Sequence, residues 1–481
     1  MIKKIVRNPS VVYLLTRYIT YAIQFFNSIF IAVLLGPSYL AVWGVILLVL
    51  QYFAQINFGI PHSLNAIMSV NKAHSNYLKI VFNNSLILVS ALCVVVLFLS
   101  ASIFFFDVNL WDKYNFSEYL PEVVLVALLT YFNQIFSNLF RVFNRLFEVA
   151  VNQSLFPITM LFCLFVWKGD SLITYLLYAN ILSCSLSLLL FVVRCPINLN
   201  FQFNVSIIRE ILLRGFFLFL YNSSFYLIMM SSRSIISAFF SPVEFGYFTF
   251  AFTVASAIML MLEAINFLVY PKILNKFGNS SREESSKTIN SIREIYIVSS
   301  YSLIFIAIFL FPAFVNFFPQ YADSIQTFRL ISLTLALYTS CFGYSSLLIS
   351  KGKERILGLF AFLTLLINVG LSLLLITVFN TSFSTAILST SLAYLIYLVI
   401  LNYHGQKELN PEITFYDSLK FGFPYSIFIP YSLFFIMAIF SFITYLYLIP
   451  LFLFLVLNMK SIYRIIKTGM SLLTNPNFFK F

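Results

Sequence analysis

Residues 1–40 read MIKKIVRNPSVVYLLTRYITYAIQFFNSIFIAVLLGPSYL. The basic residues Lys3, Lys4 and Arg7 precede the apolar run Val11–Leu35, and a Gly-Pro dipeptide follows it. The run is too long for the apolar region of a cleavable signal peptide, and it is long enough to cross a bilayer. This stretch therefore predicts a membrane helix with its basic N-terminal side in the cytoplasm.

Apolar runs and short connections alternate through the rest of the chain. Of the 481 residues, 61% are hydrophobic and 10% are charged, which excludes an ordinary soluble protein. We expect an all-α polytopic membrane protein with about fourteen transmembrane helices. The predicted spans are Val11–Leu35, Leu40–Ile67, Ile80–Phe106, Pro121–Phe140, Val149–Val166, Ser171–Val193, Ile211–Phe240, Tyr247–Tyr270, Ile295–Phe317, Ser324–Ser350, Ile356–Phe379, Phe383–Asn402 and a hairpin within Phe423–Asn458.

The positions of the lysines and arginines predict the topology. With the N-terminus inside, nearly all basic connections fall on the inner side, and the outer ones carry Lys113 and Lys168. The net charge of +12 therefore reflects orientation and contact with anionic lipid, and not nucleic-acid binding. The basic tail after Asn458 requires an even number of spans, so we expect a terminal helix hairpin and two cytoplasmic termini.

Two pairs of landmarks recur with nearly the same separation. Pro37 and Pro242 each follow a span and lie 205 residues apart, and Arg145 and Lys353 close two other spans 208 residues apart. These separations predict two six-helix halves of the same orientation, a repeat that places a central site between the halves. Chance similarity of turn residues between apolar helices is the alternative. The predicted regions are a bundle in 1–200, a second bundle in 201–405, and a terminal hairpin with a basic tail in 406–481.

The order of several motifs resembles one family of membrane transporters. The motifs are Leu35-Gly36-Pro37 with Trp43-Gly44, Asn57-Phe58-Gly59-Ile60, the stretch Arg141–Glu148, Ser232-Arg233, and Phe245-Gly246-Tyr247. Their order is similar to that in the polysaccharide transporter (O-antigen flippase) family of the multidrug/oligosaccharidyl-lipid/polysaccharide flippase superfamily. The resemblance covers the two predicted halves. Asn57 and Ser232 depart from it, because members often have an acidic residue at each position.

The resemblance implies two helical bundles around a cavity that opens alternately to the two sides of a bacterial cytoplasmic (inner) membrane. It implies a substrate of undecaprenyl-pyrophosphate carrying an oligosaccharide. We therefore expect a flippase for O-antigen, capsule or exopolysaccharide biosynthesis, with membrane lipid and with polymerase and chain-length proteins of the same pathway as partners. The alternatives are a multidrug exporter of the same superfamily and a membrane-embedded polysaccharide polymerase.

Three arginines lie inside predicted spans, where a charge is costly and usually functional. Arg17 shares a helix face with Thr20, Gln24 and Asn27, which indicates an anion-binding face. Alternatively, Arg17 reaches the headgroups while the polar stripe packs against a neighbouring helix. Arg233 is the prime candidate to bind pyrophosphate, since its planar fork donates paired hydrogen bonds. Arg329 lies near the outer end of its span, and either lines the cavity or reaches the headgroups.

Glu263 is the acidic residue that lies well inside a predicted span. It is either an H⁺ or Na⁺ coupling site or a charge partner for an interior arginine. Gln51 and Gln55 of the second span are candidate sugar-binding amides. The sequence contains no nucleotide-binding loop, HExxH motif or nucleophile elbow, so we expect a transporter and not an enzyme, with neither a cofactor nor a metal.

Overall fold

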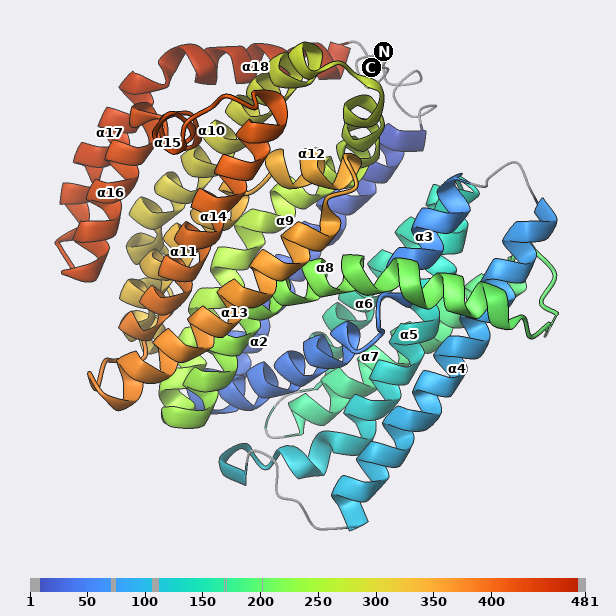
Figure 1. The fold of residues 1–481 in the computed structure, drawn as a ribbon. Helices are drawn as coiled ribbons and strands as arrows, with labels where there is room; N and C mark the ends of the chain where they lie inside the picture. Colours follow the sequence, from blue (N-terminus) through green and yellow to red (C-terminus); the bar gives the residue numbers. More distant parts are fainter. Residues whose placement is uncertain are drawn as a thin grey trace. The chain divides into compact units, whose positions relative to one another are not determined.

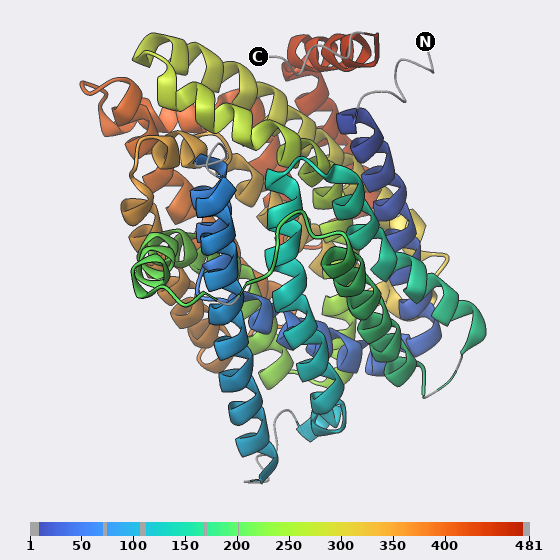
Figure 2. The same ribbon diagram turned by 90° about the vertical axis from the view of Figure 1, so that its right-hand side faces the viewer.

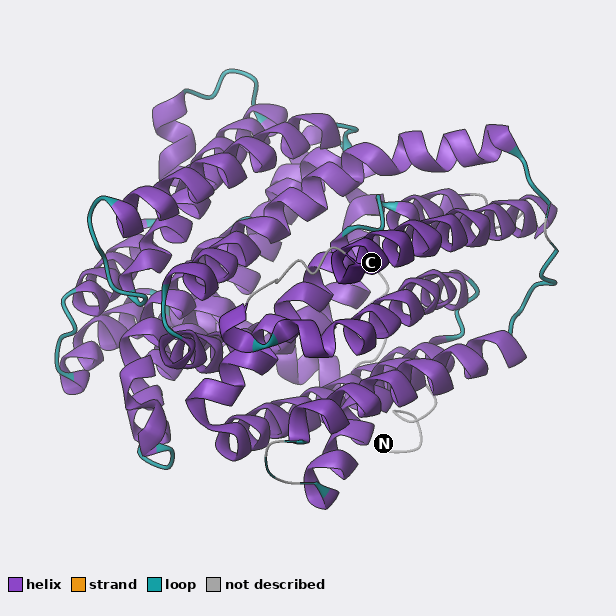
Figure 3. Ribbon diagram, turned by 90° about the horizontal axis from the view of Figure 1, so that it is seen from below, coloured by secondary structure: helices purple, strands orange, loops and turns teal. Residues whose placement is uncertain are grey.

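The computed structural model describes residues 9–70, 75–105, 112–167, 169, 171–200 and 202–474. Within these ranges the chain forms helices joined by short loops, without a strand (Figure 3). This confirms the predicted all-α fold. The chain separates into two compact units, Met1–Ser223 and Ser224–Phe481, and the boundary lies inside one long helix.

The first unit consists mainly of long apolar helices (Figure 1). Helix α6 packs against both α2 and α7, while α5 packs against α7, α3 and α4. The elements of this unit are α2 (Pro9–Gln55), α3 (Ile60–Val70), α4 (Ser75–Phe105), η1 (Asp112–Tyr114), η2 (Phe116–Tyr119), α5 (Leu120–Val142), α6 (Leu146–Val166), α7 (Leu172–Val193) and the first part of α8 (Val205–Phe239).

The second unit is built around α11, which packs against α9, α10, α14 and α16. Helix α14 in turn packs against α13 and α15. The elements of this unit are the rest of α8, α9 (Pro242–Asn279), α10 (Arg282–Val315), η3 (Pro319–Ser324), α11 (Ile325–Ser340), α12 (Tyr344–Ser350), α13 (Glu354–Thr377), η4 (Thr385–Ile387), α14 (Leu388–Leu409), α15 (Phe415–Gly422), α16 (Tyr425–Ile439), η5 (Thr444–Tyr447), α17 (Leu448–Leu457) and α18 (Met459–Thr474).

Ten helices in the described part of the chain are long and apolar enough to cross a membrane. The number rises to twelve if each of two bent pairs, α15 with α16 and α17 with α18, forms one span. The predicted fourteen spans are therefore not all separate helices. One reason is that α2, a single bent helix, covers the expected span Val11–Leu35 and also the first part of Leu40–Ile67, as far as Gln55.

The bend in α2 is at Gly36, with φ 67° and ψ 174°, a conformation essentially restricted to glycine. Pro37 follows at the first position of the second arm, where its missing N–H leaves no helical hydrogen bond broken. The two arms run in different directions (Figures 1 and 2). Pro242 has the equivalent place at the start of α9, after Ser241, whose side chain accepts a hydrogen bond from the Glu244 N–H.

Two of the predicted spans are interrupted within their apolar runs. The span Leu40–Ile67 breaks between the end of α2 and the start of α3, and the span Ser324–Ser350 breaks between α11 and α12. The terminal block forms the predicted hairpin, with α16 packed against α17. Interrupted helices expose backbone groups that need hydrogen-bond partners inside a membrane. The two breaks are therefore candidate functional sites.

Candidate functional site

The break in the first unit lies between Gln55 and Ile60. Phe58 and Gly59 have φ angles of 48° and 73°, so the chain leaves the right-handed helical region for two successive residues. Backbone carbonyl groups next to the break lose their helical partners, and inside a bilayer each requires a replacement.

Helix α5 adds side-chain hydrogen bonds on both sides of the break, all from one face. Tyr131 donates its hydroxyl hydrogen to the Phe53 carbonyl at 2.8 Å, and the Asn138 amide donates to the Pro61 carbonyl at 3.2 Å. Between them, Gln134 Oε1 accepts a hydrogen bond from Asn57 Nδ2 at 3.2 Å. The three α5 residues are spaced by three and four positions, so they share one face of the helix. We call Tyr131, Gln134 and Asn138 the α5 clamp.

Asn57 also stabilises the break from within. Its Nδ2 donates to the Ala54 carbonyl at 2.8 Å, and its Oδ1 accepts from the Gly59 N–H at 3.0 Å. The side chain is 7% exposed. An ionised carboxylate cannot donate to either acceptor, so the neutral amide of Asn57 is matched to its surroundings.

Helix α8 crosses the break where its Gly215 lies against Gly59. A Cβ atom on Gly59 would lie 2.6 Å from the Gly215 carbonyl oxygen, and a Cβ on Gly215 would lie 3.0 Å from the Gly59 carbonyl oxygen. The two backbones therefore approach more closely than any larger residue permits. Further along α8, Ser223 donates to Gln55 Oε1 at 3.0 Å.

The polar stripe of α2 has two roles. Thr20 shares a hydrogen bond with Ser154 at 2.7 Å, and Asn27 donates to the Pro157 carbonyl at 2.7 Å, so both pack against α6. Arg17 contacts Tyr21 instead, through a hydrogen bond to its hydroxyl and a guanidinium 4.3 Å from the ring centroid. Gln24, like Gln51 and Gln55 in the second arm, is half-buried. Arg17 and the three glutamines therefore remain partly accessible.

In the second unit, Arg233 is 1% exposed. Its guanidinium carbon lies 4.4 Å from the centroid of the Phe252 ring on α9, and Nη1 lies 4.0 Å from Met230 Sδ. Glu263, the residue expected to couple an ion or to pair with an arginine, lies in α9, but its side chain is outside the described part of the structure.

The neighbouring Ser232 belongs to a buried polar network. Asn368 of α13 donates to Ser231 Oγ at 2.9 Å and to Ser232 Oγ at 3.1 Å, and Ser232 shares a hydrogen bond with Thr390 of α14. Hydroxyl and amide groups thus hold α8 against α13 and α14. The sequence pattern did not predict Asn368, because its partners lie far away along the chain.

Arg329 holds the turn of the terminal hairpin. Its guanidinium donates to the Phe442 carbonyl at 3.3 Å and to Thr444 Oγ1 at 3.0 Å, and stacks 4.2 Å from the centroid of the Tyr447 ring. The residue is 4% exposed. In this structure its contacts thus serve to attach the hairpin to α11.

Arg293 is a buried arginine that the sequence placed in an inner connection. It is 6% exposed, and Nη1 donates to the Ser340 carbonyl at 2.9 Å and to the Phe342 carbonyl at 2.8 Å. These carbonyls lie at the break between α11 and α12, where Gly343 has φ 94°. A cation at the carboxyl end of a helix is favourable, so Arg293 stabilises this break as the α5 clamp stabilises the first. The only signal in the sequence was its position at the edge of an apolar run.

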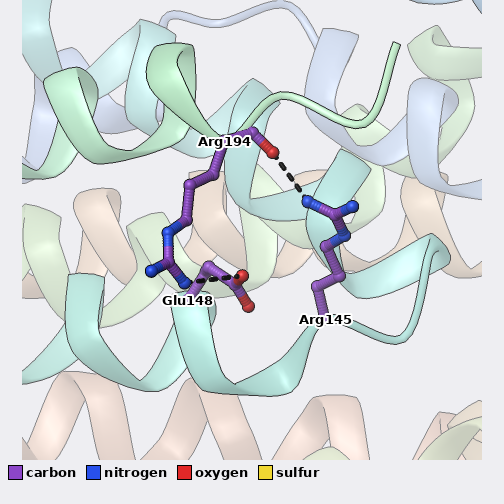
Figure 4. A network of polar contacts seen from close by, with 3 residues as sticks. All are labelled: Arg145, Glu148 and Arg194. Carbon is purple, nitrogen blue, oxygen red and sulfur yellow. Dashed lines mark hydrogen bonds and ion pairs between the residues drawn. The ribbon is translucent and has the colours of Figure 1, made fainter.

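A smaller charged network lies where α5 and α7 end and α6 begins (Figure 4). Arg194 Nη1 lies 3.4 Å from Glu148 Oε1, and Arg145 Nη1 donates to the Arg194 carbonyl at 2.7 Å. Among the described side chains, the buried charged residues are Glu148, Arg233, Arg293 and Arg329. The buried charge of the described part is therefore mainly cationic. No group of metal-ligating residues occurs there.

No protein-family model matches the sequence, and no curated protein matches it. Its fold is similar to that of solved membrane transporters. The lipid II flippase MurJ, in an inward closed conformation, matches with a TM-score of 0.69 at 15% identity, covering 96% of this chain and all of that chain. A multidrug resistance MATE family transporter of the MOP superfamily, in an inward-facing conformation, matches with a TM-score of 0.67 at 14% identity, covering 84% and 98%. An outward-facing MATE structure gives 0.63 at 15% identity, covering 85% and 98%. The chain therefore has the fold that MATE transporters share with the lipid II flippase.

Proposed function

We propose that this protein flips undecaprenyl-pyrophosphate-linked oligosaccharide units across a bacterial cytoplasmic membrane, for O-antigen, capsule or exopolysaccharide biosynthesis. The observation that carries the proposal is the similarity to the lipid II flippase, which extends over 96% of this chain and the whole of the other. A lipid II flippase moves a lipid-linked substrate across a membrane. The motif order of this sequence resembles that of a family whose substrates are also lipid-linked.

The terminal helices support the choice of a flippase. The difference between the 96% covered by the flippase and the 84% covered by the MATE transporter is close to the length of the segment α15–α18, Phe415–Thr474. We infer that this segment is the part shared with the flippase. Arg329 attaches its hairpin to α11, and we assign Arg329 this positioning role within the proposed transport site.

The buried charge supports an anionic substrate. Three arginines and one glutamate are buried among the described side chains. We assign the pyrophosphate to Arg233, since a planar guanidinium can donate paired hydrogen bonds to phosphate oxygens, with Arg17 as a second cationic contact. The partly accessible amides of Gln24, Gln51 and Gln55 are assigned to sugar hydroxyl groups.

Transport proceeds in this proposal by alternating access of one site to the two sides of the membrane, and no covalent bond is made or broken. Broken helices suit such a mechanism, since their ends present polar groups within the membrane. Glu263 either couples an H⁺ or Na⁺ gradient to the transition or neutralises Arg233. Combining substitutions of Arg233 and Glu263 separates these two roles.

A multidrug exporter is the second candidate, because the MATE transporters share the fold with a TM-score of 0.67. An exporter of cationic drugs requires acidic groups where its substrate binds. Among the described side chains, buried arginines instead outnumber buried acidic residues by three to one.

A deletion strain tests the proposal. Loss of the protein should leave lipid-linked repeat units on the inner leaflet while their synthesis continues, as measured by their inaccessibility to periodate or lectin added outside spheroplasts. Unpolymerised units accessible outside would instead indicate a polymerase. Drug hypersensitivity with normal externalisation of the units would indicate an exporter.

A further inference from the structure

The terminal hairpin is flanked at one end by two helices that turn away from it. Helix α15 is bent by 74° from α16, and α18 is bent by 68° from α17. Asn458 joins the two bends, since its Nδ2 donates to the Ser426 carbonyl at 2.8 Å. The bends turn α15 and α18 away from the direction of the hairpin helices, and Figures 1 and 2 show α18 running across the ends of the neighbouring second-unit helices.

Helix α18 has three distinct sides. Met459, Tyr463 and Ile466 are 72%, 70% and 51% exposed, and their spacing of four and three positions places them on one side. Lys460 and Lys467 are exposed on the adjacent side. An exposed apolar side next to a basic side is typical of a helix at a membrane interface.

The third side of α18 is attached to the protein. Glu294 of α10 accepts hydrogen bonds from Ser461 Oγ at 2.5 Å and from Arg464 Nη1 at 2.8 Å. This contact fixes the rotation of α18 about its own axis. It also neutralises Arg464, so the positive charge available to a ligand comes from Lys460 and Lys467.

Helix α15 adds a similar surface beside the other bend. Phe415, Tyr416 and Phe421 are 53%, 65% and 61% exposed, and Lys420 Nζ lies 4.5 Å from the centroid of the Tyr416 ring. Aromatic rings and lysines together are characteristic of residues at the level of the lipid headgroups.

We propose that α18 is an interfacial helix that binds anionic phospholipid headgroups through Lys460 and Lys467, with Met459, Tyr463 and Ile466 inserted among the acyl chains. Lipid is favoured over a protein partner because the exposed apolar side continues directly from the lipid-facing hairpin, and because the positive-inside rule places this end at the anionic cytoplasmic leaflet. This lipid-binding surface is distinct from the proposed transport site. Its proposed role does not depend on which substrate the protein transports.

Fluorescence quenching in nanodiscs tests the proposal with the full chain. Tyr463→Trp places an indole on the apolar side of α18, and the unmodified protein gives the background from Trp43, Trp111 and Trp167. The added fluorescence should be quenched by lipids brominated on their acyl chains. At equal mole fraction, brominated phosphatidylglycerol should quench more strongly than brominated phosphatidylcholine.

Removing the two lysines should remove this lipid preference. In the Tyr463→Trp protein, Lys460→Gln with Lys467→Gln should lower the apparent affinity for phosphatidylglycerol by roughly tenfold, given the usual contribution of basic residues near an anionic surface. Arg282→Gln with Lys287→Gln removes the same charge from exposed positions at the start of α10, and should leave the preference intact. Lys460→Arg with Lys467→Arg should retain it.

Three results would overturn the proposal. Equal quenching by the two brominated lipids would show insertion without headgroup recognition. Absence of quenching by either lipid would place α18 against a protein partner or a second copy of the chain. Equal losses in the α10 control and the α18 variant would show a general effect of net charge.

Discussion

Asn57 and Gln134 join an interrupted helix to its neighbour, with the Asn57 amide nitrogen 3.2 Å from the Gln134 side-chain oxygen. The same amide also donates to the Ala54 carbonyl. Both bonds need a donor at position 57, and the side chain is buried. The break in this helix is therefore held by a neutral amide.

Asn57→Asp should consequently destabilise the protein, because a carboxylate faces two acceptors in a buried position. The expected cost is about 1–3 kcal/mol, seen as a lower midpoint of thermal unfolding in detergent. Asn76→Asp, at an exposed position in the first turn of α4, makes the same chemical change and should leave the midpoint nearly unchanged. Equal stability of the two variants would show that the Asn57 amide is not needed as a donor.

The contact between Gly59 and Gly215 predicts a steric effect that can be separated from backbone strain. Gly59→Ala combines a positive φ with a clash against the Gly215 carbonyl, whereas Gly36→Ala has a positive φ and no atom within 4 Å of the new Cβ. The strain alone costs about 1–3 kcal/mol, and the clash adds to it. Gly59→Ala should therefore lower the unfolding midpoint more than Gly36→Ala does. A smaller effect at Gly59 would contradict the close crossing of α8.

Arg293→Met should loosen the break between α11 and α12. The substitution keeps much of the volume and removes the donors to the Ser340 and Phe342 carbonyls, at an expected cost of about 1–3 kcal/mol for each carbonyl left unpaired. Hydrogen exchange should increase in peptides that cover residues 340–347. Arg282→Met, at an exposed position on the same helix, should not change it, and unaltered exchange in Arg293→Met would remove the proposed role.

The helices were predictable where hydropathy dominates, and the breaks were not. Val11–Leu35 is apolar throughout, and Gly36-Pro37 identifies the bend that follows it. The break at Phe58-Gly59 lies inside a stretch predicted as one span, although Gly59 and Pro61 are local signals for a helix break. Its cost is offset by Tyr131 and Asn138, whose contribution depends on packing between residues far apart in sequence.

The candidate site was predictable to a similar extent. An arginine inside an apolar run is visible in the sequence, and the structure places Arg233 in a buried position on α8. The hydrogen-bond partners of such arginines cannot be predicted from the sequence. Arg329, for example, contacts Phe442 and Thr444, more than a hundred residues away, because the terminal hairpin folds back on α11. Arg293 precedes the predicted span Ile295–Phe317, so the hydropathy pattern assigns it to a connection. In the structure α10 begins earlier, at Arg282, and therefore includes Arg293.

Arg233 is assigned to the pyrophosphate, and substitution should reveal this in transport and not in folding. Arg233→Ala should abolish transport at normal membrane levels, and Arg233→Lys should restore it partly, since lysine keeps the charge and loses the paired donors. If Glu263 only neutralises Arg233, the double variant Arg233→Ala with Glu263→Gln should recover the activity that each single variant loses. If Glu263 couples an ion, the double variant should stay inactive, and Glu263→Gln alone should lose its response to the ion gradient.

The central claim, movement of a lipid-linked oligosaccharide, is tested most directly with purified protein in proteoliposomes. Undecaprenyl-pyrophosphate-linked oligosaccharide is placed on the inner leaflet, and its appearance on the outer leaflet is measured by binding of an added lectin. The account predicts appearance that requires the wild-type protein and is lost in Arg233→Ala reconstituted at the same density. Lectin binding that stays at the level of protein-free liposomes under imposed H⁺ and Na⁺ gradients, or that is equal for wild type and Arg233→Ala, would contradict it.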